Sequence, residues 1–357
     1  MPKKPLISVV LPVFNGENYI EAALTSIMNQ DFKDIEILVI NDGSVDQTGA
    51  ILERLAGLDK RIRVLTKGNG GLVSALNWGL AEAKADVIAR MDADDISYPS
   101  RLSKQWQVLK ERPEIGLVFS QMNKIDTRGR SIGEITNTKL SAEDVAEALS
   151  KGDCLPHHPT VMARKMDMLD VGGYREAFKG AEDLDLWYRM SKRTKLIGLS
   201  EILLDYRLHD GQVTQVSVVR QRFSRDLVAL IAKEVDAGRR DPSEGWIDAP
   251  DYAWTVDTPQ LCDAPADMLM LFSLYKLIDQ ILTDKNISDL STEDISFVLK
   301  GLNEKPFFCS AKLRQVLAHH LVQEAKQRGL RILRMNAMLF ALKNNPSRAL
   351  RKKFKPF

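Results

Sequence analysis

The sequence of 357 residues has few cysteines and no long hydrophobic run. Its three cysteines, Cys154, Cys262 and Cys309, are widely spaced and odd in number. This spacing excludes a disulfide framework and the common zinc-ligand patterns, so we expect a reducing compartment. No apolar run reaches the length of about 18 residues that a transmembrane helix requires. The first residues resemble no signal peptide, so we expect a cytoplasmic protein.

An excess of one charge sign is also missing. Lysine and arginine total 50 and aspartate and glutamate total 48, which leaves a formal net charge of +2. This balance excludes binding to nucleic acid through bulk electrostatics, and we expect no nucleic-acid partner. The hydrophobic content of 44% and charged content of 27% are typical of globular proteins. The length suits two domains, or one large domain with an appendage.

Hydrophobic periodicity predicts strands alternating with helices in the first quarter of the chain. This alternation predicts an α/β fold whose parallel strands carry helices on both faces. In such sheets, ligands bind at the carboxyl ends of the strands. The predicted strands are 6–13, 35–40, 61–65 and 86–91, and the predicted helices are 17–30, 51–58 and 72–83.

Polar residues follow each of these strands. They are Asn15, Asp42, the lysine- and glycine-bearing segment 67–71, and the acidic segment 92–95. A nucleoside diphosphate with a divalent metal would use carboxylates, a glycine loop and a lysine together. Each turn taken alone is explained equally well as a solvated turn. Neither GxGxxG nor GxxxxGK[ST] occurs, which disfavours dinucleotide-binding and P-loop proteins.

The segment 92–95 carries an Asp-x-Asp pattern at the end of a buried strand. Residues two apart point the same way on extended chain, so Asp92 and Asp94 can share one Mg²⁺ or Mn²⁺ with a substrate phosphate. The alternative is an acidic turn without a ligand, because such tripeptides are common on turns.

Several motifs in order resemble the family 2 glycosyltransferases over about residues 6–215. Their order and spacing, rather than any one of them, carry the resemblance. The matching segments are Pro12–Asn15, Val39–Ser44 with Asp46 and Thr48, Asn69–Gly71, Met91–Asp95, His158–Thr160, Gly172–Tyr174, Glu182–Asp183 and Tyr206–His209.

This resemblance implies a GT-A fold, with a mostly parallel central sheet flanked by helices. It also implies a nucleotide-sugar donor, Mn²⁺ or Mg²⁺ as cofactor, and sugar transfer with inversion. In the family, the position of Asp42 contacts the base. We expect metal binding by Asp92, Asp94 and His209. The expected nucleotide-binding residues are Pro12, Phe14, Asn15, Asp42, Lys67, Asn69, Gly70, Asp92 and Ala93.

By the same resemblance, Asp183 is the base that deprotonates the acceptor hydroxyl. Glu182 is expected to position the acceptor or support the loop, and His158 to have a structural role near the acceptor. The alternative for the acidic pair is a favourable interaction with the dipole of the helix that it opens. His209 is either a metal or diphosphate contact or a structural histidine. Arg207 either contacts phosphate or pairs with an acid.

Strand patterns fade after residue 214. We therefore expect a GT-A catalytic domain over 1–215, divided into a nucleotide-binding half, 1–98, and an acceptor half, 99–215. Residues 216–357 are expected to be mainly helical, with helices over 216–237, 268–282, 291–302 and 311–341. After Glu324 every charged residue is lysine or arginine. This basic helix either rests on an anionic membrane surface, at the inner face of the cytoplasmic membrane, or packs as an ordinary helix.

The functional hypothesis is a metal-dependent inverting glycosyltransferase of the bacterial surface-polysaccharide or lipopolysaccharide type. It would transfer a sugar to a saccharide or lipid-linked saccharide. UDP is the expected nucleotide, with GDP and dTDP open. The alternatives are a nucleotidyltransferase acting on a sugar phosphate, and a non-catalytic sugar-binding relative.

Overall fold

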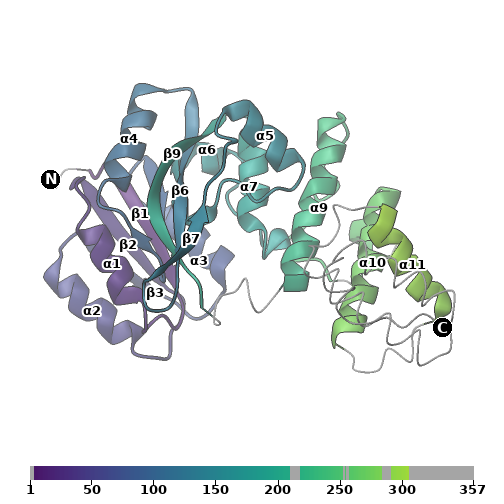
Figure 1. The fold of residues 1–357 in the computed structure, drawn as a ribbon, viewed down its shortest axis with the longest axis horizontal. Coiled ribbons are helices and arrows are strands. Elements are labelled where there is room, and N and C mark those ends of the chain that lie inside the picture. Colours follow the sequence, from purple (N-terminus) through teal and green to yellow (C-terminus); the bar gives the residue numbers. More distant parts are fainter. Residues whose placement is uncertain (1–3, 210–217, 252–253, 255–256, 284–290, 305–357) are drawn as a thin grey trace. The chain divides into compact units, whose positions relative to one another are not determined.

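The chain forms two compact units, Met1–Val216 and Ser217–Phe357, and each is described by itself. The computed structural model describes residues 4–209, 218–251, 254, 257–283 and 291–304 (Figure 1).

The first half of the first unit is the parallel sheet that the sequence predicts. Its four strands lie in the order β3-β2-β1-β4, and every neighbouring pair is parallel. Figure 1 shows helices between them in sequence. The bounds are β1 Ile7–Val13, α1 Ile20–Met28, β2 Ile35–Asn41, α2 Thr48–Leu58, β3 Ile62–Thr66, α3 Leu72–Glu82 and β4 Val87–Arg90.

The second half extends the same sheet with strands of mixed direction. β8 is antiparallel to β4, β6 is antiparallel to β8, and β9 is parallel to β6. β5 and β7 are antiparallel to β9 and β6, respectively. The strands are β5 Ile96–Ser97, β6 Ile115–Ile125, β7 Ser131–Ile135, β8 Met162–Arg164 and β9 Lys195–Arg207. The helices are α4 Arg101–Glu111, α5 Ala142–Ser150, η1 His158–Thr160, α6 Lys165–Asp170, η2 Glu176–Phe178 and α7 Glu182–Ser191.

The core lies on both faces of this sheet because strand side chains alternate between faces. On one face, Ile7, Val9 and Leu11 of β1 belong to a buried cluster with α1, α2 and α4. On the other face α3 lies close to the sheet at Gly79. A Cβ atom there would come within 2.6 Å of the Val10 side chain, so this helix position needs glycine.

β9 extends beyond its apolar segment, 197–204, because its polar last residues continue the ladder. Asp205 pairs with Ile96 of β5 and with Asn123 of β6. This extension brings the end of β9 beside the acidic loop that follows β4. The polar segment 123–150 contributes the end of β6, the β7 hairpin strand and α5, whose N-cap Ser141 accepts a hydrogen bond from the Asp144 backbone.

The second unit is helical where it is described. Tyr275 of α10 donates a 2.6 Å hydrogen bond from its hydroxyl to the buried Asp226 of α9. The expected helix 311–341 and the basic tail lie outside the described residues. Among the described helices, none is long and apolar enough to cross a membrane. The elements are α9 Val218–Asp236, η3 Pro259–Leu261, α10 Ala266–Thr283 and α11 Thr292–Glu304.

Candidate active site

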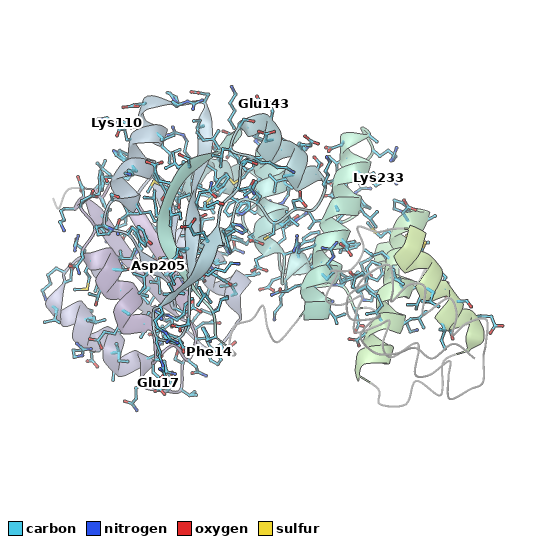
Figure 2. The ribbon with its side chains drawn as sticks, in the orientation of Figure 1. Phe14, Glu17, Lys110, Glu143, Asp205 and Lys233 are labelled. Atoms are coloured by element: carbon cyan, nitrogen blue, oxygen red, sulfur yellow. The ribbon has the colours of Figure 1, made fainter. Side chains whose placement is uncertain are left out.

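The loops that follow β1 and β2 are tied to each other through Asn15. Its backbone N–H donates to the Ser44 hydroxyl at 2.9 Å, and its side-chain oxygen accepts from the Val45 backbone at 2.9 Å. Asn15 takes a positive φ of 51°, which asparagine tolerates better than most residues. Beside it, half of the Phe14 side chain is exposed, and Figure 2 shows Phe14 and Glu17 at the same end of the sheet. Both loops therefore have defined conformations.

Asp42 holds the glycine loop that follows β3. Its two carboxylate oxygens accept hydrogen bonds from the backbones of Gly70 (3.0 Å) and Gly71 (2.8 Å). The Lys67 ammonium lies 3.3 Å from the same carboxylate. Gly71 has a φ of +84° and is the N-cap of α3. The buried Asp42 therefore fixes the conformation of the glycine loop at the N-terminus of α3.

The remaining predicted nucleotide-binding residues lie at this same rim. Pro12 is in β1, paired with Ile40 of β2. The backbone of Asn69 approaches Gly43 so closely that a Cβ atom on Gly43 would lie 2.7 Å from the Asn69 nitrogen. Ala93 lies close to Gly16, since a Cβ added there would be 4.0 Å from that of Ala93. The structure thus brings the loops after β1, β2, β3 and β4 together.

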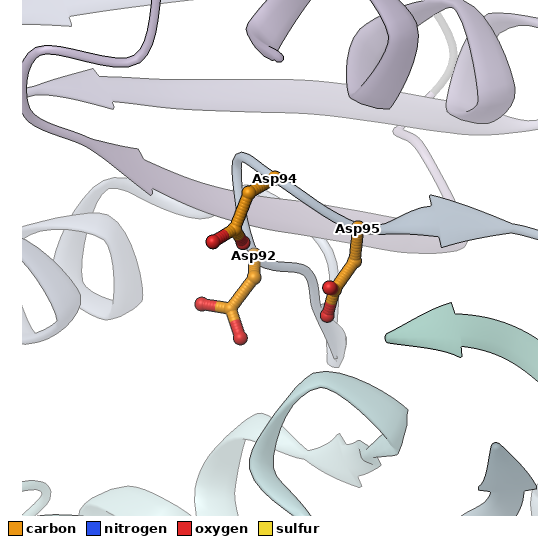
Figure 3. Close-up of side chains that lie close together, drawn as sticks. All are labelled: Asp92, Asp94 and Asp95. Atoms are coloured by element: carbon orange, nitrogen blue, oxygen red, sulfur yellow. The ribbon is translucent and has the colours of Figure 1, made fainter. Parts of the chain in front are cut away.

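The loop after β4 gathers three carboxylates. One oxygen from each of Asp92, Asp94 and Asp95 lies within 4.8 Å of the others. Figure 3 shows the three side chains extending from one loop toward the same side. Asp92 and Asp94 are about one-quarter exposed, at 27% and 25%, whereas Asp95 is fully buried. Two carboxylates are therefore accessible, and the third is buried beside them.

Electrostatics disfavour three anions at this place without a cation. Burial raises the pKa of Asp94, with a further increase from the charge of Asp92. Burial also raises the pKa of Asp95 well above its usual range, as do the charges of Asp92 and Asp94. The Oδ2 atom of Asp95 accepts no hydrogen bond from the described residues. Hard oxygen ligands that repel one another fit a divalent cation such as Mg²⁺ or Mn²⁺.

The end of β9 holds this acidic loop in place. The backbone N–H of Arg207 donates to Asp95 at 2.9 Å, and its guanidinium Nε donates to the Asp94 carbonyl at 2.8 Å. His209 lies with Nε2 2.8 Å from the Asp94 carboxylate, and its ring contacts Tyr19 at 4.9 Å. His209 therefore reaches the acidic cluster. Arg207 thus holds the acidic loop through the Asp94 carbonyl and the Asp95 carboxylate.

The second acidic pair opens α7. Burial raises the pKa of Glu182 to about 7, and the charge of Asp183 adds to this increase. A hydrogen bond of 2.6 Å from the Gly180 backbone to Glu182 opposes it. The Oδ1 atom of Asp183 accepts from the Leu184 backbone at 2.8 Å. Near neutral pH the pair thus carries less than two full negative charges.

Two residues show that the acidic centres lie within electrostatic range of each other. Burial raises the pKa of the Tyr174 hydroxyl, and the charges of Asp183, Glu182 and Asp92 raise it further. Arg90, at the end of β4, forms an ion pair with Asp92, and its charge also acts on Glu182. Acids from the β4 loop and from α7 therefore act on common neighbours.

His158 lies behind this site rather than at its surface. Its Nε2 is 2.9 Å from the Tyr174 hydroxyl, and its ring contacts Trp187 of α7 at 5.8 Å. Burial lowers the pKa of His158 well below its usual range, and the charge of Arg90 lowers it further. A neutral, buried histidine that contacts α7 can support the acidic pair without binding a ligand itself.

The start of α7 is anchored by Asp185, which is 2% exposed. It accepts hydrogen bonds from both Arg175 (Nε, 3.0 Å) and Arg189 (Nη2, 2.6 Å). Arg189 also donates to the Gly173 carbonyl at 2.7 Å. The arginines thereby tie the loop before α7 to the helix that carries Asp183.

Replacing Asp185 with alanine should destabilise the protein by at least about 2 kcal/mol, because two partly buried arginines lose their shared, buried partner. Urea unfolding measures the change. The matched control is Asp170→Ala, whose exposed carboxylate lies 3.9 Å from Arg193. The control should cost less than about 1 kcal/mol. Equal losses for the two variants would show that Asp185 is not an anchor.

Sequence patterns left three residues of the site unassigned. Asp95 was visible as the third carboxylate of its loop, and Tyr174 as the aromatic residue after Gly172-Gly173. Arg90 had no local signal except its position two residues before Asp92. Arg90 belongs to the site because α7 lies near the end of β4. The two elements are about 90 residues apart in the sequence, so no local pattern predicts this proximity.

Comparison with known proteins agrees with this geometry. Residues 8–166 match the family model described as Glycosyl transferase family 2. An uncharacterised glycosyltransferase of Haemophilus influenzae is 33% identical over 60% of this chain and 69% of its own length. The O-antigen biosynthesis glycosyltransferase WbnJ of Escherichia coli is 33% identical over 57% of this chain and 80% of its own length.

Solved structures support the fold. The structure of Staphylococcus aureus TarS, residues 1–349, in complex with UDP-GlcNAc superposes with a TM-score of 0.56. The match covers 98% of this chain and 93% of that one at 16% identity, which shows the expected GT-A fold and nothing further. The two relatives above match over more than two-thirds of their own lengths. The chain belongs to glycosyl transferase family 2 and is a transferase enzyme.

Proposed function

We propose that this protein is a metal-dependent, inverting glycosyltransferase that uses a UDP-sugar and extends a saccharide or lipid-linked saccharide of a bacterial surface polysaccharide. The observation that supports it most is that contacting residues link the two acidic centres. Arg90 pairs with Asp92, and its backbone N–H donates to Val161 beside η1, whose His158 contacts α7. The cation-binding carboxylates after β4 and the acidic pair of α7 both act on Tyr174. Displacement of a diphosphate by a hydroxyl needs a cation at one end and a base at the other.

The proposed nucleotide site is the rim of β1 to β4, within the nucleotide-binding half 1–98. Hydrogen bonds between loops hold Asn15 and the glycine loop before any ligand is bound. Such preorganisation lowers the entropic cost of binding. The proposed contacts are Pro12, Phe14, Asn15, Asp42, Lys67, Asn69, Gly70, Asp92 and Ala93.

A divalent cation, Mn²⁺ or Mg²⁺, would be held by Asp94 and Asp92, with His209 beside Asp94. Such a cation stabilises the negative charge of a departing diphosphate. The chain contributes the position of these ligands. Arg207, at the end of β9, fixes the loop through hydrogen bonds to the buried Asp95 carboxylate and to the Asp94 carbonyl.

The proposed base is Asp183, in the acceptor half 99–215. The acceptor oxygen forms a bond to the anomeric carbon as the bond to the diphosphate breaks, and its proton passes to the Asp183 carboxylate. Attack from the side opposite the diphosphate inverts the anomeric centre, with a transition state that resembles an oxocarbenium ion. Glu182 is proposed to position the acceptor, supported by its hydrogen bond from Gly180, and His158 to support α7.

The substrates are proposed by similarity. The TarS structure contains UDP-GlcNAc, which favours UDP among the nucleotides, and WbnJ is named for O-antigen biosynthesis, which favours a surface saccharide as acceptor. We propose a cytoplasmic site of action, with peripheral contact between the C-terminal basic helix and the inner face of the membrane. The three widely spaced cysteines agree with a reducing compartment.

A thermal-shift panel of UDP-, GDP- and dTDP-sugars tests the proposal. A UDP-sugar at 100 times its Kd should raise Tm by about 5 °C or more with Mn²⁺ present, because ligand binding stabilises the folded state. EDTA should abolish the increase. Stabilisation by GDP- or dTDP-sugars instead would show that UDP is not the nucleotide of the donor. An increase unaffected by EDTA would contradict metal dependence, and no increase with any nucleotide sugar would contradict the function.

A further inference from the structure

The backbone of Arg90 is held by hydrogen bonds from both neighbours of strand β4. It is the last residue of β4 and pairs with Val10 of β1. Its N–H donates to the Val161 carbonyl at 2.9 Å, and its carbonyl accepts from the Arg101 guanidinium at 2.6 Å. The direction of its side chain is therefore set by the fold, and only 4% of the residue is exposed.

The guanidinium of Arg90 is incompletely satisfied. Its Nη1 atom forms an ion pair with one oxygen of Asp92, but the buried Nε has no hydrogen-bond acceptor among the described residues, and none of their hydrogen bonds involves Nη2. By contrast, the fully buried Arg101 donates to the Arg90 and Val161 carbonyls and to Gln105. Buried charged donors without acceptors are costly, so the Arg90 guanidinium is suited to donate hydrogen bonds to oxygen atoms of a ligand.

Arg90 lies near elements of both acidic centres. Its side chain pairs with Asp92 of the acidic loop, and its backbone N–H donates to Val161 beside η1. The His158 ring of η1 contacts Trp187 of α7. The guanidinium thus lies close both to the acidic loop and to the elements packed against the helix that carries the proposed base. The proposed reaction indicates which part of the substrate would lie near Arg90.

In an inverting displacement, the sugar must lie between the leaving diphosphate and the attacking hydroxyl. The diphosphate belongs with the carboxylates after β4, and the hydroxyl belongs with α7. We propose that Arg90 binds the transferred sugar of the donor, through hydrogen bonds from its guanidinium to sugar oxygens. This proposal rests on the proposed function and adds a residue that selects the nucleotide sugar over the free nucleotide.

The experiment compares Arg90→Met and Arg90→Lys with the wild-type protein. Calorimetry with Mn²⁺ measures Kd for UDP and for the UDP-sugar that gives the largest thermal shift. Arg90→Met should weaken binding of the UDP-sugar by about 10- to 100-fold, the usual effect of hydrogen bonds to a charged group. Binding of UDP should change by less than about twofold. Arg90→Lys keeps the charge but lacks the planar fork, so it should weaken UDP-sugar binding by about 3- to 10-fold.

Arg164→Met is the matched control, because Arg164 is a partly buried arginine of the neighbouring β8 that donates to the Ile115 and Leu109 carbonyls. It should lower Tm and leave the ratio of the two Kd values unchanged. If Arg90→Met does not fold, Arg90→Lys decides the question.

An equal loss of UDP and UDP-sugar binding in the Arg90 variants would overturn the proposal, since it would mean that Arg90 acts through Asp92 and the metal. Unchanged binding of both ligands would also overturn it. If the wild-type protein itself binds no nucleotide sugar, the proposed function fails, and the role of Arg90 fails with it. The wild-type titration therefore separates the two failures.

Discussion

Asp183→Asn should lower kcat for sugar transfer by at least about 100-fold, the smaller end of the range for loss of a general base. The amide keeps the shape of the side chain and can still accept the hydrogen bond from the Leu184 backbone. It cannot accept the proton of the acceptor hydroxyl. Because Asp183 belongs to α7 and not to the nucleotide rim, the affinity for the UDP-sugar should change by less than about twofold.

Release of UDP in the presence of an acceptor measures kcat, and calorimetry with Mn²⁺ measures nucleotide binding. Asp170→Asn, an exposed acid on the preceding helix α6, is the control and should retain wild-type turnover. Turnover by Asp183→Asn at more than about a tenth of the wild-type rate would exclude Asp183 as the base. In that case Glu182, whose pKa of about 7 suits proton transfer near neutral pH, would be the next residue to test.

Asp94→Asn should have opposite effects on the protein with and without metal. With Mn²⁺, UDP should bind at least about 10-fold more weakly, because a charged oxygen ligand beside His209 is lost. Without metal, the variant should be more stable than the wild type at pH 7. Burial and Asp92 raise the pKa of Asp94 in the folded state, so its ionised form destabilises that state once the pH exceeds this pKa.

Calorimetry with UDP and Mn²⁺ measures the first effect, and urea unfolding in EDTA at pH 7 and pH 4 measures the second. The gain in stability should shrink at the lower pH, where the wild-type carboxyl is more often protonated. Asp86→Asn is the control, since this exposed acid lies just before β4 and pairs with Lys4. Unchanged Mn²⁺-dependent binding in Asp94→Asn would exclude Asp94 as a metal ligand.

The parts of the fold that depend on neighbouring residues were predictable. Runs such as 35–40 are apolar and β-branched because both faces of the parallel strands are covered, and the polar residues after them stop each strand. The same local patterns predicted the carboxylates at 92–95 and the glycine loop. All of this information lies within about ten residues of sequence at each place.

The contacts that complete the site span much longer separations. Arg207 binds the carboxylate of Asp95 across 112 residues, and Asn77 of α3 binds the backbone of Tyr174 across 97. The polar end of β9, Asp205 to Arg207, has no hydrophobic pattern, because it is held by pairing with β5 and β6. A single sequence contains both residues of each pair but does not indicate that they are in contact.

The order in which the chain is synthesised gives the attachment of β9 a further meaning. The loop of Asp94 is complete early in synthesis, but the groups that hold it, Arg207 and His209, emerge from the ribosome more than a hundred residues later. We expect the three carboxylates to lack a fixed arrangement until then. A nascent chain that ends before β9 should accordingly bind a divalent cation more weakly than the complete protein.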